Sequence, residues 1–237
     1  MRVLVTRPQP GASRTMRRLQ ELGFEPLLLP LTETVTLRVG ADAASDNAVA
    51  VAVTSANAVR HAPKELIRAL AALPCHAVGR RTAEAARSTG FLSVSEGAGD
   101  AERLAEAIAA GLSGKAVVYL TGRVRFPAFE ARLRKAGVEV RTVETYDTIS
   151  LDYSDAEIRT RLSDQAVDAV LLYSAKAAAA LQALASRAEL RDLLENMQAF
   201  ALSERVAAAF DNAAGKKIRI ARETQEEALL ELLHRGD

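Results

Sequence analysis

Hydrophobic residues along the chain gather in short continuous runs, and amphipathic, alanine-rich segments separate these runs. Runs such as 2–6 (RVLVT) and 48–54 (AVAVAVT) predict strands that are buried on both faces. The segment 13–23 predicts a helix that ends at Gly23, because glycine commonly follows the last turn of a helix. Further strands are predicted at 24–30, 76–79, 115–121, 138–146, 167–174, 198–203 and 217–221. Alternation of such strands with helices predicts an α/β fold with parallel sheets covered on both faces.

The chain also repeats itself. The stretch VLVTRP, with Thr6, matches VVYLTGRV, with Thr121, at an offset of 115 residues. VAVTSANAV matches VLLYSAKAA with Ser55 and Ser174 119 residues apart, and HAVGRRTAEAA matches FALSERVAAAF at an offset of 124 residues. A strand followed by an acidic helix then closes each half. The shared order and slowly growing offsets predict an internal duplication and two similar domains, against the alternative that α/β units look alike by chance.

Two long β-rich segments, 25–37 and 138–151, occupy the same place in each repeat. Strands in globular domains usually span about 3–10 residues, so segments of this length can leave one domain and enter the next. If the two segments pair as a ladder, the first domain is discontinuous and the second is inserted into it. The predicted division is then domain 1 at 1–33 and 152–237, domain 2 at 38–146, and linkers at 34–37 and 147–151. The alternatives are a simple division near Gly114, or strands that are followed by ordinary loops.

Composition and charge narrow the classes of function. The 237 residues are 49% hydrophobic and 26% charged, which is typical of a soluble globular protein. Lys and Arg total 31 against 30 Asp and Glu, so charge does not indicate nucleic-acid binding. The single cysteine, Cys75, excludes an intramolecular disulfide and indicates a reducing compartment. No stretch approaches the roughly 20 apolar residues of a membrane span. The apolar run at the start of the sequence, before Thr6, has only three residues, whereas a secretory hydrophobic region has about 7–15. We therefore expect a cytoplasmic protein without membrane contact.

Hydroxyl groups, glycines and cations follow the predicted strands at their carboxyl ends, where open parallel sheets bind ligands. Most of these positions precede a helix, whose N–H groups and partial positive charge favour anions, and arginine adds bidentate hydrogen bonds to carboxylates. The candidate binding residues are Thr6, Arg7, Thr54, Ser55, Ala56, Asn57, Gly79, Thr82, Thr121, Gly122, Arg123, Ser174, Ala175, Lys176 and Ser203. Plain N-capping is the alternative for the hydroxylic residues, and a solvated surface charge is the alternative for the cations.

The sequence lacks motifs for cofactors and metals. SEGAGD (95–100) contains GxG but lacks the third glycine and the preceding first strand of a dinucleotide-binding fingerprint. Neither GxxxxGK[ST] nor GxSxG occurs, and the adjacent Cys75 and His76 have no metal-ligand spacing around them. Aromatic residues are only 4% of the chain, which disfavours a stacking platform for bases. We therefore expect neither a cofactor nor a metal ion.

Several stretches, taken in order, resemble the uroporphyrinogen-III synthase family: VLVTRP with LQELGFEPLLLPL, VAVTSANAV, AVGRRTAEAA, VETYDT, LLYSAKAAAAL and ALSERVAAAF. The resemblance covers nearly the whole chain, and the order of the motifs is more specific than any one of them. It implies two flavodoxin-like α/β domains joined by a two-stranded ladder, with the N-terminal unit belonging to the C-terminal domain. It also implies a monomer without metal or cofactor. Such an enzyme converts the linear tetrapyrrole hydroxymethylbilane into uroporphyrinogen III, with loss of water, ring closure and inversion of ring D.

The resemblance implies roles for particular residues. The family's substrate bears acetate and propionate groups and lies in the cleft between the domains, which fits strand ends rich in donors and cations. Tyr146, in VETYDT, matches the family tyrosine beside that cleft, and we expect its hydroxyl to help the substrate hydroxyl depart. A tyrosine that only packs the hinge is the alternative. Thr82 matches the threonine of the family's GxxTA pattern, whereas Ser203 and Val206 stand where glycine and threonine are common.

A second class of function is also consistent with the sequence. Two α/β lobes joined by a hinge could close on a polyanionic small molecule without any chemistry. Supplying freshly made hydroxymethylbilane and analysing the isomers that form would distinguish an enzyme from such a binding protein.

Overall fold

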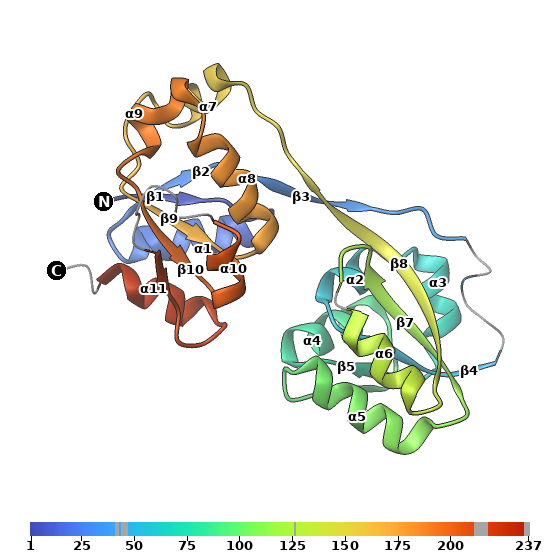
Figure 1. Cartoon of the computed structure of the whole chain (residues 1–237). Coiled ribbons are helices and arrows are strands. Elements are labelled where there is room, and N and C mark those ends of the chain that lie inside the picture. Colours follow the sequence, from blue (N-terminus) through green and yellow to red (C-terminus); the bar gives the residue numbers. More distant parts are fainter. Residues whose placement is uncertain (41–42, 44–46, 126, 211–217, 235–237) are drawn as a thin grey trace. The chain divides into compact units, whose positions relative to one another are not determined.

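The computed structural model describes residues 1–40, 43, 47–125, 127–210 and 218–234. The chain divides into two compact units (Figure 1). Unit 1 consists of Met1–Glu33 with Ile149–Asp237, and unit 2 consists of Thr34–Thr148. Each unit has its own sheet with helices on both faces, which confirms the predicted α/β class.

Unit 1 contains a five-stranded sheet in the order β11-β10-β9-β1-β2, and its neighbouring strands pair in parallel. The strands are β1 (Arg2–Val5), β2 (Glu25–Leu28), β9 (Ala169–Leu172), β10 (Gln198–Ala201) and β11 (Ile218–Ile220). Central strands such as β9 are apolar without alternation because helices cover both faces of the sheet.

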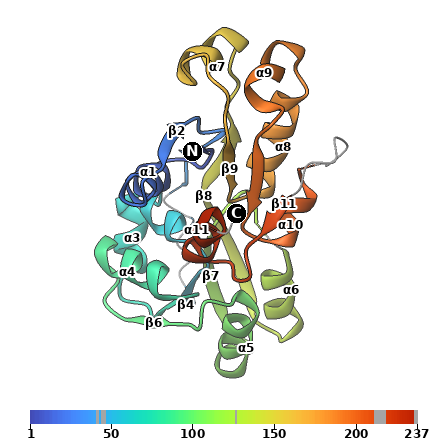
Figure 2. The same ribbon diagram turned by 90° about the vertical axis from the view of Figure 1, so that its left-hand side faces the viewer.

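Two helical layers enclose the sheet of unit 1 (Figure 1 and Figure 2). Helices α1 (Gly11–Glu21) and α11 (Glu226–His234) cover the face that carries Val3 and Val5. The face that carries Leu4 is covered by α7 (Asp155–Arg161), α8 (Ala175–Ala185), the short 3-10 helix η2 (Ala188–Leu190), α9 (Arg191–Leu194) and α10 (Glu204–Ala208). Successive strand residues therefore pack into opposite layers, as strand geometry requires.

Unit 2 contains a six-stranded sheet in the order β3-β8-β7-β4-β5-β6. The pairs from β8 to β6 are parallel. The strands are β3 (Thr32–Thr36), β4 (Ala48–Val53), β5 (Cys75–Ala77), β6 (Val94–Glu96), β7 (Ala116–Gly122) and β8 (Glu139–Ser150). Strands β3 and β8 are neighbours at one edge of this sheet, and the first residues of β3 and the last residues of β8 belong to the segments of unit 1.

The sheet of unit 2 is also covered on both faces. Helices α2 (Ala56–Arg60), α3 (Lys64–Leu70) and α4 (Arg80–Thr89) pack on the face that carries Val51 and Val53. Helices α5 (Ala101–Leu112) and α6 (Pro127–Lys135) pack on the face that carries Ala50 and Ala52.

The repeat predicted from the sequence is confirmed in the order of the strands. The sequence matches pair β1 with β7, β9 with β4, and β10 with β5. With these equivalences, the order β11-β10-β9-β1-β2 of unit 1 corresponds to β6-β5-β4-β7-β8 of unit 2. Both units therefore place equivalent strand ends at equivalent positions.

Strands β3 and β8 lie next to each other at the edge of the second sheet. The amide of Leu37 donates to the carbonyl of Thr145 at 2.9 Å, and that of Leu151 donates to Leu31 at 3.0 Å. Residue numbers rise along one strand as they fall along the other, so the two strands run antiparallel. They occupy most of the segments expected as linkers, and they carry the chain between the residues of unit 1 and those of unit 2.

Several element boundaries differ from those expected. Helix α1 begins at Gly11, before the predicted start, and it ends ahead of Gly23, which has a positive φ of 81°. The strand predicted at 76–79 is β5, which stops at Ala77 because Gly79 is the N-cap of α4. Lys217, the first residue of the strand predicted at 217–221, lies outside the described residues.

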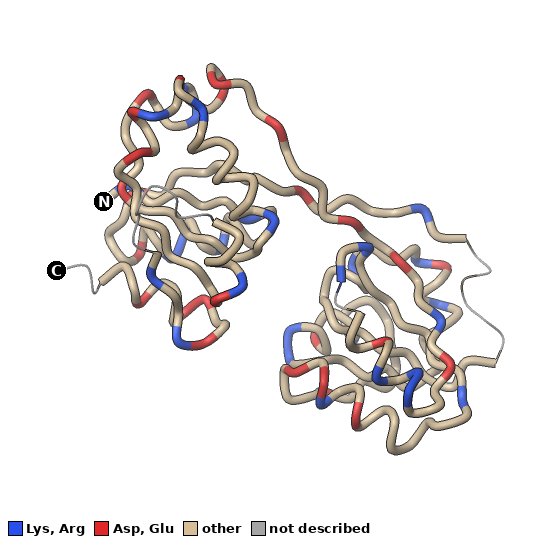
Figure 3. Tube along the Cα trace, viewed as in Figure 1, with Lys and Arg blue, Asp and Glu red and all other residues tan. Residues whose placement is uncertain are grey.

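Charged residues of both signs are interspersed along both units (Figure 3). This distribution agrees with the formal net charge of +1. Among the described helices, none is long and apolar enough to cross a membrane.

Candidate functional site

In unit 2, the turn after β4 brings hydroxyl groups together. Ser55 is the N-cap of α2, and its Oγ accepts a hydrogen bond from the amide of Asn57 at 3.2 Å. Thr54 Oγ1 lies 2.7 Å from the hydroxyl of Tyr119. Tyr146, on β8, donates from its hydroxyl to Ser55 Oγ at 3.1 Å. The predicted binding residues Thr54 and Ser55 and the predicted catalytic residue Tyr146 therefore lie together at the carboxyl end of β4.

The ring of Tyr146 is held closely on two sides. A Cβ atom on Gly122 would lie 2.6 Å from Tyr146 Cζ, so only glycine permits this approach of the ring to β7. The ring centroid of His61 lies 5.9 Å from that of Tyr146. Burial raises the pKa of Tyr146, and the hydrogen bond to Ser55 offsets this only in part. The hydroxyl therefore stays protonated at neutral pH and acts as a donor.

An extra residue in β8 sets the direction of Tyr146. The register pairs Thr121 with Glu144 but Gly122 with Tyr146, so Thr145 is an extra residue on β8. Thr145 is fully buried, and its hydroxyl donates to a carbonyl oxygen of α2 at 2.7 Å. The hydroxyl of Tyr146 donates to Ser55, which is the N-cap of the same helix. Successive residues of a regular strand point to opposite faces, so both can reach α2 only because the strand is irregular here.

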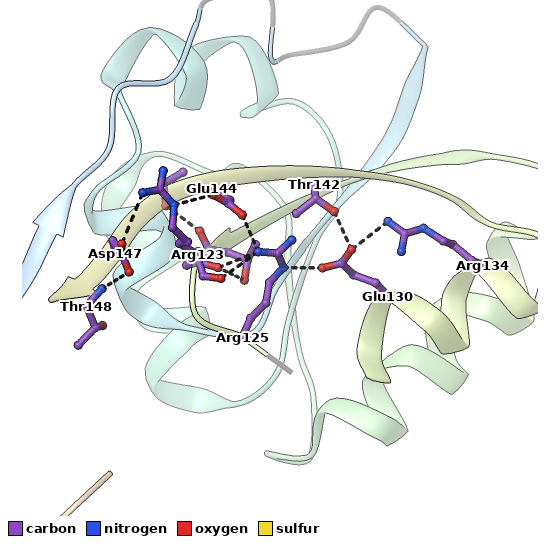
Figure 4. A network of polar contacts seen from close by, with 11 residues as sticks. Arg123, Arg125, Glu130, Arg134, Thr142, Glu144, Asp147 and Thr148 are labelled. Atoms are coloured by element: carbon purple, nitrogen blue, oxygen red, sulfur yellow. Dashed lines mark hydrogen bonds and ion pairs between the residues drawn. The ribbon is translucent and has the colours of Figure 1, made fainter. Parts of the chain in front are cut away.

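A network of ion pairs surrounds the end of β7 (Figure 4). Arg123 is exposed, and it contacts Glu144 at 3.2 Å and Asp147 at 3.5 Å. Arg125 contacts Glu144 at 2.7 Å and Glu130, on α6, at 2.5 Å. The hydrogen bond from Arg125 lowers the pKa of Glu144 below its ordinary value. The candidate binding residue Arg123 is thus part of an internal network as well as of the surface.

Three candidate threonines have buried side chains. Thr6 donates to the carbonyl of Leu171, on β9, at 2.9 Å. Thr121 is 2% exposed at the end of β7, and Thr82 is 6% exposed inside α4. Gly79 is the N-cap of α4, and a Cβ atom added to it would lie 3.1 Å from the Cα of Gly99. The buried side chains of these threonines therefore serve the packing of the units, and their roles as binding residues stay predictions.

In unit 1, Ser174 takes the place that Ser55 has in unit 2. Ser174 is the N-cap of α8, and its Oγ accepts a hydrogen bond from a first-turn amide at 3.2 Å. Ala175 and Lys176 follow in this first turn, and Ala56 and Asn57 have the same places in α2. Ser203 is the N-cap of α10. Unit 1 therefore has serine N-caps after β9 and β10, whereas unit 2 has a serine N-cap after β4 and the glycine N-cap Gly79 after β5.

Arg7 is engaged inside unit 1. Its Nη1 lies 3.0 Å from Glu226 Oε1, and its guanidinium lies 4.1 Å from the centre of the Tyr173 ring. Tyr173 donates to the same carboxylate at 2.8 Å, Thr15 also donates to it, and Arg18 lies 3.5 Å away. Burial alone would raise the pKa of Glu226, but these donors and cations lower it below its ordinary value.

The acidic partners in both units were missed by sequence reasoning. Glu226 lies far from Arg7 along the chain, and no local pattern connects them. Arg125 and Glu130 stand only five residues apart in the sequence, and this short spacing was a local signal that could have been followed. Among the described residues, no three His, Cys, Asp or Glu side chains are grouped as a metal site requires.

Comparisons with known proteins agree with this architecture. The family model for uroporphyrinogen-III synthase HemD matches residues 13–231. A crystal structure of uroporphyrinogen-III synthetase from Helicobacter pylori has a TM-score of 0.68 at 20% identity, over 99% of each chain. A mutant uroporphyrinogen III synthase from the extremely thermophilic bacterium Thermus thermophilus has a TM-score of 0.56 at 19% identity, over 99% of this chain and 98% of that chain. No curated protein matches this chain. Because the family model spans most of its length, the chain belongs to the uroporphyrinogen-III synthase family.

Proposed function

We propose that this protein converts hydroxymethylbilane into uroporphyrinogen III and that Tyr146 assists the departure of the substrate hydroxyl. Membership of the family makes the chain an enzyme of lyase type in porphyrin and haem biosynthesis. One observation carries the proposed site. The protonated hydroxyl of Tyr146 lies 3.1 Å from Ser55 Oγ at the carboxyl end of a central parallel strand, which is where open sheets of this kind bind ligands.

Carboxylates of the substrate would be bound by donors at the strand ends of each unit. Ser55 and Ser174 accept hydrogen bonds from helix amides, so each hydroxyl proton is left to be donated to a ligand. The first amides of α4 and α8 have no partner within their helices, and they favour negative charge. Lys176 and Arg123 add positive charge beside two of these ends. The remaining candidates, Thr6, Arg7, Thr54, Ala56, Asn57, Gly79, Thr82, Thr121, Gly122, Ala175 and Ser203, stay predictions for this site.

The raised pKa of Tyr146 decides what the residue can contribute. Complete proton transfer from such a phenol is costly, whereas a hydrogen bond to the departing hydroxyl is not. Loss of that hydroxyl with a proton, as water, gives an electrophilic azafulvene, and the substituted carbon of ring D bonds to its methylene carbon to form a spiro intermediate. The bond from the spiro carbon to the original bridging carbon then breaks, and that bridging carbon bonds to the free α-carbon of ring D, which releases a proton. Because uncatalysed closure gives the unrearranged isomer, holding one folded geometry of the substrate is the larger task of the enzyme.

Further properties belong to the same proposal. We propose that the enzyme works as a monomer in the cytoplasm, without a cofactor, a metal ion, nucleic acid or a membrane partner. The single cysteine supports a reducing compartment, and the balance of 31 Lys and Arg against 30 Asp and Glu does not indicate nucleic-acid binding. The two domains would be those predicted, 1–33 with 152–237 and 38–146. A binding protein without chemistry is not favoured, because the chain belongs to a family of synthases.

Substitution of two tyrosines tests the role of Tyr146. We expect Tyr146→Phe to slow the formation of uroporphyrinogen III about 100-fold, in the range typical of a lost hydrogen-bond donor to developing charge. Tyr153→Phe is the matched control, because the hydroxyl of Tyr153 donates to the carbonyl of Pro30 at 2.8 Å. Turnover by Tyr146→Phe at the rate of the Tyr153→Phe variant would contradict the proposed role.

A further inference from the structure

The end of β8 carries an irregularity that aims Tyr146 at α2, and irregular strand ends need support from their surroundings. We propose that Arg125 is a positioning residue that holds this strand end so that Tyr146 presents its hydroxyl to Ser55. The inference rests on the proposed role of Tyr146. Arg125 is not one of the candidate binding residues predicted from the sequence. The hydrogen bonds described for its side chain go to Glu130, Glu144 and backbone carbonyls, and not to Tyr146 or Ser55.

Arg125 joins three parts of unit 2 (Figure 4). Its Nε donates to Glu130 on α6 at 2.5 Å, and its Nη1 donates to Glu144 on β8 at 2.7 Å. The same Nη1 lies 3.1 Å from the carbonyl oxygen of Arg123 and 3.4 Å from that of Gly122. A planar guanidinium with several fixed donors suits such a junction better than a flexible ammonium does. Arg125 therefore connects the end of β7 to α6 and to β8.

The anchor of this junction is Glu130. Its side chain is 8% exposed, and it accepts hydrogen bonds from Arg134 at 2.9 Å and Thr142 at 3.0 Å as well as from Arg125. Burial would raise the pKa of Glu130, but these donors lower it, so the carboxylate stays charged. A buried, charged carboxylate with three donors has little freedom, and it fixes the guanidinium that it binds.

The contacts of the junction fall on both sides of Tyr146. Glu144 lies before the extra residue of β8, and Arg125 and Arg123 both bind it. Asp147 lies directly after Tyr146, and Arg123 contacts it at 3.5 Å. The amide of Arg123 donates to the carbonyl of Tyr146 itself at 2.8 Å. The turn that Arg125 holds thus fixes the backbone of Tyr146. Gly122, at the end of β7 before this turn, packs against the ring of Tyr146.

Loss of Arg125 would release this strand end without removing any donor of the proposed substrate site. We expect Arg125→Gln to lower kcat about 10- to 100-fold, because small misplacements of a catalytic group cost rate, and to change KM little. Arg132→Gln is the matched control. Arg132 lies on α6 and also binds two glutamates, but these are exposed residues of α5. We expect this control to retain the kcat of the parent protein.

A spectroscopic measurement separates positioning from general stability. In protein labelled with carbon-13 at the tyrosine Cζ, the Tyr146 resonance is assigned with Tyr146→Phe and then followed between neutral and alkaline pH. We expect Arg125→Gln, and not Arg132→Gln, to move this resonance and to lower the pKa of Tyr146 toward the ordinary value of 10.0. An unchanged resonance and an unchanged kcat in Arg125→Gln would overturn the inference.

Two further variants keep the test decisive. Should Arg125→Gln fail to fold, Glu144→Gln removes the contact near Tyr146 and leaves the pair of Arg125 with Glu130 intact, and it should move the same resonance. Adding Tyr146→Phe to Arg125→Gln should lower kcat no further than Tyr146→Phe alone, whereas multiplied effects would overturn the inference. Full activity of Tyr146→Phe alone would instead refute the proposed role of Tyr146, while the resonance still reports whether Arg125 positions it.

Discussion

At the residue scale, several side chains that could bind a ligand already form hydrogen bonds or ion pairs with other residues of the protein. Arg7 follows a central strand, as an anion-binding residue would, yet its guanidinium pairs with Glu226 and lies over Tyr173. Thr6 donates to a neighbouring strand. A residue type at a strand end therefore predicts a location well, but it does not predict whether the side chain is directed to a ligand or to the protein.

Glu226 gives a residue-scale prediction about acid stability. Its folded-state pKa lies below the ordinary value of 4.5, so it stabilises the fold above pH 4.5, and this contribution is lost as pH falls through the lower, folded-state pKa. We expect Glu226→Gln to lower the free energy of unfolding by about 1.5–3 kcal/mol at pH 7, the range for hydrogen bonds to charged groups. The variant should also lose less stability than the parent protein when the pH is lowered to about 3.

Urea unfolding followed by circular dichroism measures this effect. Glu227→Gln is the control, because Glu227 is 64% exposed and its pair with Arg18 is at the surface. Equal stabilities of the two variants at neutral pH, with parallel losses as the solution is acidified, would argue against the described role of Glu226.

At the element scale, the helices and strands follow from hydrophobic pattern, whereas their irregular ends do not. Continuous apolar runs such as 48–54 became strands because both faces are covered. The extra residue at Thr145 could not be predicted, since it depends on the register between β7 and β8 rather than on either strand alone. The site residues are subject to the same limit: their positions at strand ends follow from the pattern, and their partners across the fold do not.

Two glycines give an element-scale prediction. Gly23 follows α1 with a φ of 81°, and a Cβ there would meet nothing within 4 Å, so Gly23→Ala should cost about 1 kcal/mol through backbone strain alone. Gly111 lies inside α5 with equally open space and no positive φ. Gly111→Ala should therefore stabilise the protein by about 0.5–1 kcal/mol. Urea unfolding of both variants measures the difference, and a shift of the same sign in both would contradict this interpretation.

At the scale of the whole molecule, two units with the same strand order have separate hydrophobic cores. Unit 1 has core clusters on both faces of its sheet, and so has unit 2. The repeat in the sequence was sufficient to predict this duplication, because it preserves the order of strands and helices even where individual side chains differ. The ion pair of Arg7 with Glu226 was not predictable in this way, because it joins opposite ends of the chain.

Separate cores predict separate responses to core substitutions. Leu181→Ala in unit 1 and Leu120→Ala in unit 2 each remove a fully buried side chain, and each should cost about 2–5 kcal/mol. Hydrogen exchange measured by mass spectrometry should show faster exchange mainly within the unit that carries the substitution. Equal acceleration in both units by either variant would show that the two cores unfold together.

The proposed activity is that this chain directs ring closure toward the rearranged isomer, and the identity of the product decides whether it does so. Freshly made hydroxymethylbilane is supplied to the purified protein, and the products are oxidised and separated as isomers. We expect uroporphyrinogen III as the main product, formed faster than spontaneous closure yields the unrearranged isomer. Formation of the unrearranged isomer alone, at the spontaneous rate, would show that the protein lacks the proposed activity.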